Sequence, residues 1–224
     1  RASAGSEPLT LGMTFPYSSH NYLLRDWMAA GGLDPDEDVR LVVLPPPYMV
    51  QSLASGHVDG FCVGAPWNSV AAAQGVGRIL HFGADLVDRC AEKVLAVSPR
   101  LASRDLDIMV RLTRATLRAM AFIADQANHA SIAALLAKPQ WLDCDANLIE
   151  QTLDGALKFD HSGAVKNHSA YLVINSAAAR PEHLLAAWLY GQMVRWGQAE
   201  WSEAGLRAAQ SVFRCDIFDD ACAG

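Results

Sequence analysis

A strand, a polar turn and a helix follow one another in Gly12-Met-Thr-Phe-Pro-Tyr-Ser-Ser-His20-Asn-Tyr-Leu-Leu-Arg25, near the start of the 224-residue chain. Ser18 or Ser19 can cap the helix, whose apolar residues recur on one face. The first turn of a helix directs backbone N–H groups and the positive end of the helix dipole outward. This junction is therefore suited to binding a small anion.

Two comparable junctions occur later, at Leu44-Pro-Pro-Pro-Tyr48 and at Gly60-Phe-Cys-Val-Gly-Ala-Pro-Trp-Asn68. Each has a strand signal before it and a helix signal after it. Strands and helices that alternate with short links form a parallel sheet, because the crossovers are right-handed. We therefore expect the three junctions to face one crevice, which is a binding site in outline.

The first part of the chain alternates between strand and helix, and the second part is mainly helical. The expected strands are Leu9–Phe15, Val39–Leu44, Gly60–Val63, Ile79–Phe82 and Lys93–Val97. The expected later helices include an apolar stripe from Ile108 to Phe122, Ala130–Ala137, Ala146–Leu157, a helix opened by Pro181, and Ala204–Val212. Between them, Lys158–Ala179 is expected to form a loop or a hairpin. The pattern predicts an α/β ligand-binding lobe over residues 1–97 and a mainly helical part over residues 98–224.

Charge and composition narrow the class of protein. Apolar residues make up 51% of the chain, and the formal net charge is −6 without a run of Lys or Arg. Nucleic acid is therefore a poor partner, because phosphate binding needs a basic face. No apolar stretch approaches the roughly 20 residues that span a bilayer. The five scattered cysteines predict neither a disulfide framework nor a zinc site, and they slightly favour a reducing compartment.

Cys62 offers an enzymatic alternative. Gly60-Phe-Cys-Val-Gly64 has the shape of a nucleophile elbow, for which His161 or His168 could be the base. The flanking residues fit poorly, since Pro66 follows where a helix should begin. A buried strand cysteine is the favoured interpretation, and we expect no catalysis. The histidines have no metal spacing, although His20 could converge with others, so neither a metal nor another cofactor is expected.

Lys93 lies in Cys90-Ala-Glu-Lys-Val-Leu-Ala-Val97, which has the apolar character of a strand. A lysine on a buried strand is costly unless an anion or a carboxylate pairs with it. The partner is either a ligand or a neighbouring carboxylate such as that of Glu92 or Asp88. The residues alone leave both interpretations open.

Five segments carry a resemblance to a known family. They are Thr14–Arg25, Trp27–Pro35, Val43–Val50, Asp59–Asn68 and the pair Glu92-Lys93. The chain resembles the nitrate/bicarbonate-binding proteins of ABC transporters, within the wider nitrate, sulfonate and taurine class of solute receptors. The resemblance implies the type II periplasmic-binding-protein fold, a clamshell of two lobes that holds its ligand in the cleft between them.

The resemblance also implies roles for particular residues. His20 matches an anion-contacting histidine, Lys93 matches a lysine that pairs with nitrate, and Pro46 matches a residue that lines the cleft. The full set of candidate ligand-binding residues is Ser18, Ser19, His20, Pro46, Pro66, Trp67 and Lys93. Lys and His are suited to a planar oxyanion because they donate charge-assisted hydrogen bonds.

Two departures from the family pattern stand out. Ala65 occupies the position where many relatives carry Glu before Pro-Trp. The family's receptors also have a preceding segment, on the order of a domain in size, that builds most of the first lobe. The resemblance therefore implies that this chain is a C-terminal portion, with the first lobe largely missing.

The expected function is binding of nitrate or nitrite for delivery to an ABC permease. The alternative is a nitrate sensor of the same fold that sequesters an antitermination regulator. The receptor would be periplasmic and the sensor cytoplasmic.

Overall fold

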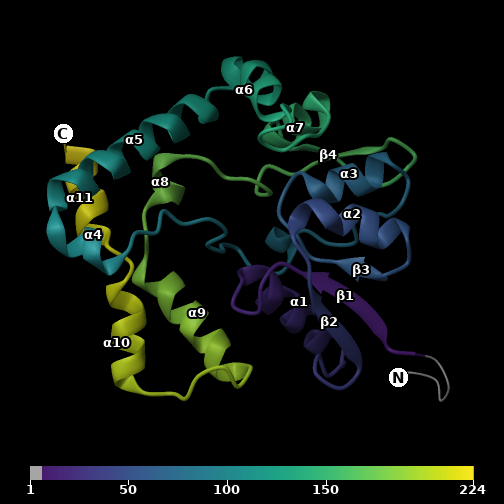
Figure 1. Cartoon of the computed structure of the whole chain (residues 1–224), viewed down its shortest axis with the longest axis horizontal. Coiled ribbons are helices and arrows are strands. Elements are labelled where there is room, and N and C mark those ends of the chain that lie inside the picture. Colours follow the sequence, from purple (N-terminus) through teal and green to yellow (C-terminus); the bar gives the residue numbers. More distant parts are fainter. Residues whose placement is uncertain (1–6, 224) are drawn as a thin grey trace. The chain divides into compact units, whose positions relative to one another are not determined.

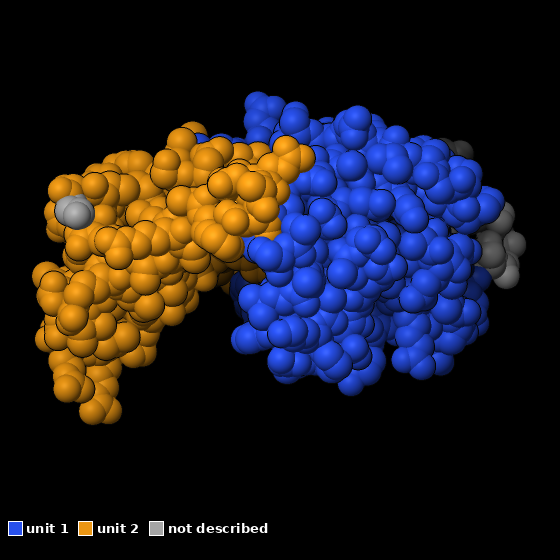
Figure 2. Space-filling view, turned by 90° about the horizontal axis from the view of Figure 1, so that it is seen from above, with its two compact units in different colours: residues 1–90, 129–172 blue, residues 91–128, 173–224 orange. Residues whose placement is uncertain are grey.

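The computed structural model describes residues 7–223, which belong to two compact units. Unit 1 takes in the chain up to residue 90 and residues 129–172, whereas unit 2 takes in residues 91–128 and the chain from residue 173 (Figure 2). Each unit is therefore built from two separate stretches of sequence. The functional division at residue 97 stays a prediction.

A parallel sheet forms the centre of unit 1. In the described part of this unit, β1 (Leu9–Met13) lies between β2 (Val39–Val43) and β3 (Gly60–Phe61). The register runs from Leu9 opposite Val39 to Met13 opposite Val43, and Gly12 lies opposite Phe61. The three predicted strands are confirmed, although each ends earlier than expected. The remaining elements of unit 1 are α1 (Ser19–Ala30), α2 (Pro46–Ala54), α3 (Trp67–Ala73), η1 (Gly83–Asp85), α6 (His129–Leu136), α7 (Ala146–Leu153), β4 (Ala156–Lys158) and β5 (Val165–Asn167).

Helices cover both faces of this sheet (Figure 1). On one face Met13 packs with Leu24 and Met28 of α1. Neighbouring residues of a strand point to opposite faces, so Gly12 points toward α2. A Cβ atom on Gly12 would lie 3.1 Å from the Met49 sulfur of α2. Glycine at this position therefore lets α2 pack closely against the sheet.

A second apolar cluster joins the early helices to a later one. Val50 of α2, Val70 and Ala71 of α3, and Leu148 of α7 are buried together. Leu148 comes from the second stretch of unit 1. After α7, β4 and β5 pair as an antiparallel hairpin. A loop or hairpin was expected from Lys158 to Ala179, whereas β4 begins at Ala156 and Ser176–Ala179 is a short helix.

The regular secondary structure of unit 2 is entirely helical in the part of the chain that the structure describes. Its elements are α4 (Pro99–Arg104), α5 (Leu106–Ala124), η2 (Gln126–Asn128), α8 (Ser176–Ala179), α9 (His183–Arg195), α10 (Glu203–Ser211) and α11 (Cys215–Ala223). Arg114 of α5 donates from Nε to the Ala221 carbonyl at 3.0 Å, close to the end of α11. Arg180 and Asp219 form a two-bond ion pair, with a shorter bond of 2.8 Å.

Several local expectations were wrong. Ile79–Phe82 and Lys93–Val97 are not strands. An apolar run becomes a strand only beside another strand that can share its hydrogen bonds, and Ile79 has instead a bond from its N–H to the Phe159 carbonyl, at 2.8 Å. Val94 is largely exposed, at 67%. The helix expected over Ala146–Leu157 ends at Leu153, and α11 was not predicted.

Candidate functional site

The carboxyl ends of β1, β2 and β3 lie at one edge of the sheet, because the strands are parallel. From that edge the chain enters α1, α2 and α3 (Figure 1). In open α/β sheets this edge is where ligands bind. The first turns of these helices contain no acidic residue, so nothing there cancels the positive ends of the helix dipoles.

The β1–α1 turn is closed by Ser18. Its hydroxyl donates to the Phe15 carbonyl at 2.7 Å and accepts from the Asn21 N–H at 3.2 Å, which makes it the N-cap of α1. Ser19 is buried and opens the helix. His20 is half-buried, with Nδ1 3.5 Å from the Thr14 hydroxyl. Three predicted site residues are thus brought together on one turn.

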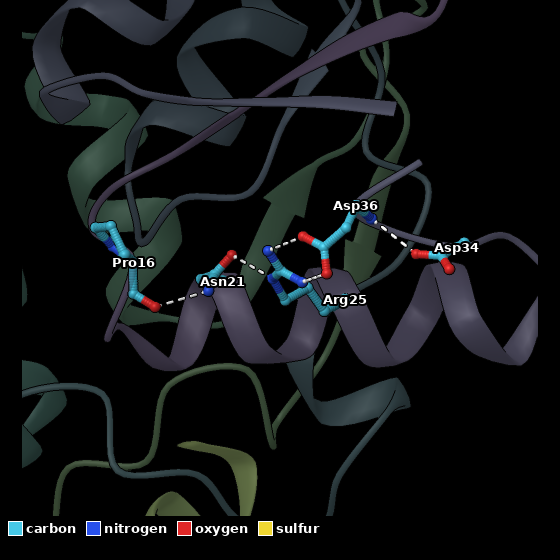
Figure 3. A network of polar contacts seen from close by, with 5 residues as sticks. All are labelled: Pro16, Asn21, Arg25, Asp34 and Asp36. Atoms are coloured by element: carbon cyan, nitrogen blue, oxygen red, sulfur yellow. Dashed lines mark hydrogen bonds and ion pairs between the residues drawn. The ribbon is translucent and has the colours of Figure 1, made fainter. Parts of the chain in front are cut away.

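A polar network runs from this turn along α1 (Figure 3). The Asn21 amide lies between the Pro16 carbonyl, 2.7 Å from Nδ2, and the Arg25 guanidinium, with Oδ1 3.3 Å from Nε. Arg25 forms a two-bond pair with Asp36. Hydrogen bonding from Arg25 holds the pKa of the Asp36 carboxyl below its usual value.

The β2–α2 junction contributes shape rather than donors. Leu44 still bonds to the sheet, from its N–H to the Met13 carbonyl at 2.9 Å. Pro46 and Pro47 then fill the first two positions of α2 and have no N–H. Tyr48 donates its N–H to the Pro45 carbonyl at 3.0 Å. Pro46 therefore has no N–H to offer a ligand. The role that the resemblance implies for it, lining the ligand-binding cleft, stays a prediction.

Pro66 and Trp67 occupy the β3–α3 junction. Pro66 is buried and follows a cis peptide bond after Ala65. Trp67 is partly buried and packs against the cluster that contains Val50 and Val70. Both residues are therefore part of the packed structure of the junction, and a ligand-binding role for them stays a prediction.

Asn68 and Tyr171 were missed by sequence reasoning. The Asn68 amide donates from Nδ2 to the Tyr171 hydroxyl at 2.7 Å. The Tyr171 ring packs edge-on against Phe82, with centroids 5.2 Å apart, and the His168 ring also packs edge-on against Phe82, with centroids 4.9 Å apart. His168 also lies 3.2 Å from Asp85, through Nε2 and Oδ1. No local signal could have revealed these links, because their partners are far apart in sequence.

Lys93 lies in unit 2, apart from the other six candidates, which belong to unit 1. Its side chain is 80% exposed, and Nζ lies 2.9 Å from Glu92 Oε1. The expected buried strand lysine is therefore wrong. The carboxylate partner that the sequence left open is present, and a ligand role for Lys93 stays a prediction.

Cys62 does not form a nucleophile elbow. Its N–H donates to the Gly12 carbonyl at 2.9 Å, and its side chain packs with the cluster under α1. Val63–Pro66 then separate it from α3, so the strand does not lead directly into a helix as a nucleophile elbow requires. Within residues 7–223, no group of three or more His, Cys, Asp or Glu side chains could hold a metal ion. No helix in the same range is both long and apolar enough to cross a membrane.

Comparison with known families classifies the chain. Residues 1–137 match the model of the NMT1-like family, which is more than half of the chain. The chain belongs to the NMT1-like family. It is 33% identical over 217 residues to the nitrate import ATP-binding protein NrtC of Synechocystis, covering 95% of this chain and 32% of that protein. It is 34% identical over 212 residues to the bicarbonate transport ATP-binding protein CmpC of the same organism, covering 95% of this chain and 32% of that protein.

Among solved structures, this NMT1-like chain is similar to the periplasmic nitrate-binding protein NrtA from Synechocystis. The TM-score is 0.90 at 25% sequence identity, over 98% of this chain and 57% of that one. The predicted α/β fold of the periplasmic-binding-protein type is therefore confirmed. So is the resemblance to the nitrate/bicarbonate-binding family. The chain spans about a third of the two curated relatives named above and just over half of the solved one.

Proposed function

We propose that the protein binds a small oxyanion, nitrate or nitrite, as the solute-binding component of an ABC-type import system. The observation that carries the proposal is the similarity to nitrate-binding NrtA, with a TM-score of 0.90 over nearly the whole chain. In this proposal the protein is a periplasmic receptor, its partner is an ABC permease, and it performs no catalysis.

The chemistry of the β1–α1 turn supports an anion rather than a cation. Helix geometry directs the N–H groups of Ser19 and His20 outward, and no acid stands in the first turn of α1. The Ser19 hydroxyl and the His20 imidazole add donors at the same place, whereas the Ser18 hydroxyl already donates to the Phe15 carbonyl. Such donors suit a planar oxyanion, which offers only acceptors.

The small size of the ligand makes an enclosed site necessary. Small ligands gain at most roughly 1.5 kcal/mol per non-hydrogen atom. For nitrate this corresponds to a dissociation constant of about 10⁻⁴–10⁻⁵ M. Charge-assisted bonds can exceed that ceiling only where water is excluded. The family resemblance is the ground for proposing Lys93 as the cation that pairs with the bound anion; in this structure its side chain is 80% exposed and pairs with Glu92.

The test is a calorimetric titration of the complete natural gene product with nitrate, nitrite, bicarbonate and a small sulfonate. We expect saturable binding of nitrate or nitrite, and its loss in Lys93→Ala. Lys138→Ala is the matched control, since it removes one exposed positive charge elsewhere. Stronger binding of bicarbonate or sulfonate would replace nitrate as the ligand. An unchanged affinity in Lys93→Ala would remove that residue from the site.

A second candidate is favoured by the two ATP-binding relatives, to which identity reaches 33–34%. In this alternative the oxyanion-binding fold is a sensing part of an importer's ATPase subunit. Mass determination of the natural gene product separates the two, because only the second requires an ATP-binding segment in the same polypeptide. The names of these relatives concern nitrate import and bicarbonate transport, which supports a transport role over sequestration of an antitermination regulator.

A further inference from the structure

The guanidinium group of Arg25 is fixed by Asp36. Nη1 donates to Oδ2 at 3.0 Å and Nη2 donates to Oδ1 at 2.7 Å (Figure 3). A two-bond fork sets the plane of the guanidinium as well as its position. Asp36 is itself held, because its backbone N–H donates to Asp34 Oδ1 at 2.9 Å. The loop after α1 thus holds the Asp36 carboxylate in place against Arg25 of α1.

The orientation of the Asn21 amide follows from that of Arg25. The Arg25 Nε–H points at Asn21 Oδ1, 3.3 Å away. A guanidinium carries donors only, so Asn21 has to present its oxygen to Arg25 and its NH2 group to the other side. There Nδ2 donates to the Pro16 carbonyl at 2.7 Å. Asn21 is only 1% exposed, so a reversed amide would oppose like groups without water to relieve them.

The Pro16 carbonyl matters because carbonyl oxygens repel an anion. The preceding carbonyl, that of Phe15, is occupied by the Ser18 N–H at 3.0 Å and the Ser18 hydroxyl at 2.7 Å. With both carbonyls bound to protein donors, the turn presents N–H groups rather than carbonyl oxygens at the sheet edge. The Asn21 amide is one donor that keeps the Pro16 carbonyl turned toward the protein rather than toward that edge.

We propose that Arg25 and Asn21 are positioning residues of the oxyanion site. Arg25 sets the amide of Asn21, and Asn21 holds the Pro16 carbonyl in the arrangement that keeps the first turn of α1 open to an anion. Neither side chain needs to touch the ligand. The consequence for binding rests on the proposed function, whereas the consequence for the turn does not.

The experiment uses isotope-labelled complete gene product and three variants. Arg25→Met keeps the apolar stem and removes every donor. Arg25→Lys keeps the charge and can still pair with Asp36, but it lacks the fork and the Nε–H. Asp36→Asn changes an exposed partner and leaves the core intact. Arg40→Met is the control, since Arg40 is an exposed arginine on β2.

The readouts are the ¹⁵N-correlated signals of the Asn21 side-chain amide and of the Ser19 and His20 backbone amides, together with nitrate affinity. In Arg25→Met we expect all these signals to shift and nitrate affinity to fall about tenfold, equivalent to one net hydrogen bond. Arg25→Lys should restore thermal stability without restoring the signals or the affinity. Asp36→Asn should shift the amide signals and lower the nitrate affinity in the same direction as Arg25→Met, but by a smaller amount. Arg40→Met should match the wild type.

Three outcomes would overturn the inference. The first is an Asn21 amide signal that does not move in Arg25→Met. The second is a shifted turn with unchanged nitrate affinity, and the third is full recovery of affinity in Arg25→Lys. If the wild-type protein binds no oxyanion, the proposed function fails, and the amide signals alone still decide whether Arg25 orients Asn21.

Discussion

Asn68 and Tyr171 are 103 positions apart in sequence, yet a 2.7 Å hydrogen bond joins them at the start of α3. Tyr171 is fixed in turn by edge-on packing against Phe82, which is buried. The second residue of α3 is therefore held by a side chain from the far end of unit 1. This single contact ties the β3–α3 junction to the segment that follows the hairpin.

Replacing Tyr171 with Phe should destabilise the protein by about 1 kcal/mol. The ring keeps its packing against Phe82, but the Asn68 amide loses its acceptor. Urea unfolding measures the difference. Tyr48→Phe is the matched control, because the Tyr48 side chain is exposed on α2. Equal stability of the two variants would show that the Asn68 bond adds nothing.

At the scale of elements, η1 is held by Asp85. The Phe82 N–H donates to Asp85 Oδ2 at 2.9 Å, and His168 lies against Oδ1. The Phe82 N–H is the main cause that lowers the pKa of the Asp85 carboxyl. The His168 hydrogen bond and the charges of Lys166 and His168 act in the same direction, while burial opposes them.

A carboxyl group whose pKa is lower in the folded than in the unfolded protein stabilises the fold above its unfolded value, about 3.9. That contribution is lost as pH falls through the folded value. The free energy of unfolding should therefore fall more steeply below about pH 4 in the wild type than in Asp85→Asn. Urea midpoints across this range measure the two curves. Parallel curves would contradict the role of Asp85.

Local signals were sufficient for the elements that build the site edge. β1, β2 and β3 were predicted because short apolar runs alternate with helix starts. Ser18 and Ser19 were both predicted as possible caps from their residue type, and the structure shows that Ser18 is the cap. The false strand at Lys93–Val97 has the same apolar character. Sequence does not say whether a neighbouring strand exists to complete its hydrogen bonds.

The contacts that support the site could not be predicted from local sequence either, because they also depend on which segments meet in the folded chain. The Asn21 amide could be placed on α1 from sequence, but its partners Pro16 and Arg25 depend on the path of the turn. Tyr171 carries no signal near its own position that points to α3. Contacts between residues so far apart in sequence become visible only in the folded structure.

At the scale of the whole molecule, the chain passes from one unit to the other after residues 90, 128 and 172. The first of these passages lies in a stretch without helix or strand, from residue 86 to residue 98. Arg89 and Lys93 are both exposed within it. Backbone outside regular structure adapts most easily to a protease.

Limited digestion with trypsin should therefore cut first after Arg89 or Lys93. The arginines of α5, such as Arg111, lie in a continuous helix and should be cut later. Mass spectrometry of early fragments identifies the sites. The double variant Arg89→Gln, Lys93→Gln should delay the first cleavage. Early products that begin inside α5 would contradict the assignment.

The interleaving of the two units has a consequence during synthesis. Val50, Val70 and Ala71 emerge from the ribosome well before Leu148, which completes their cluster. At about 5–20 residues per second, this interval lasts on the order of several seconds. Until Leu148 arrives, α2 and α3 expose this apolar patch, the kind of surface that chaperones bind.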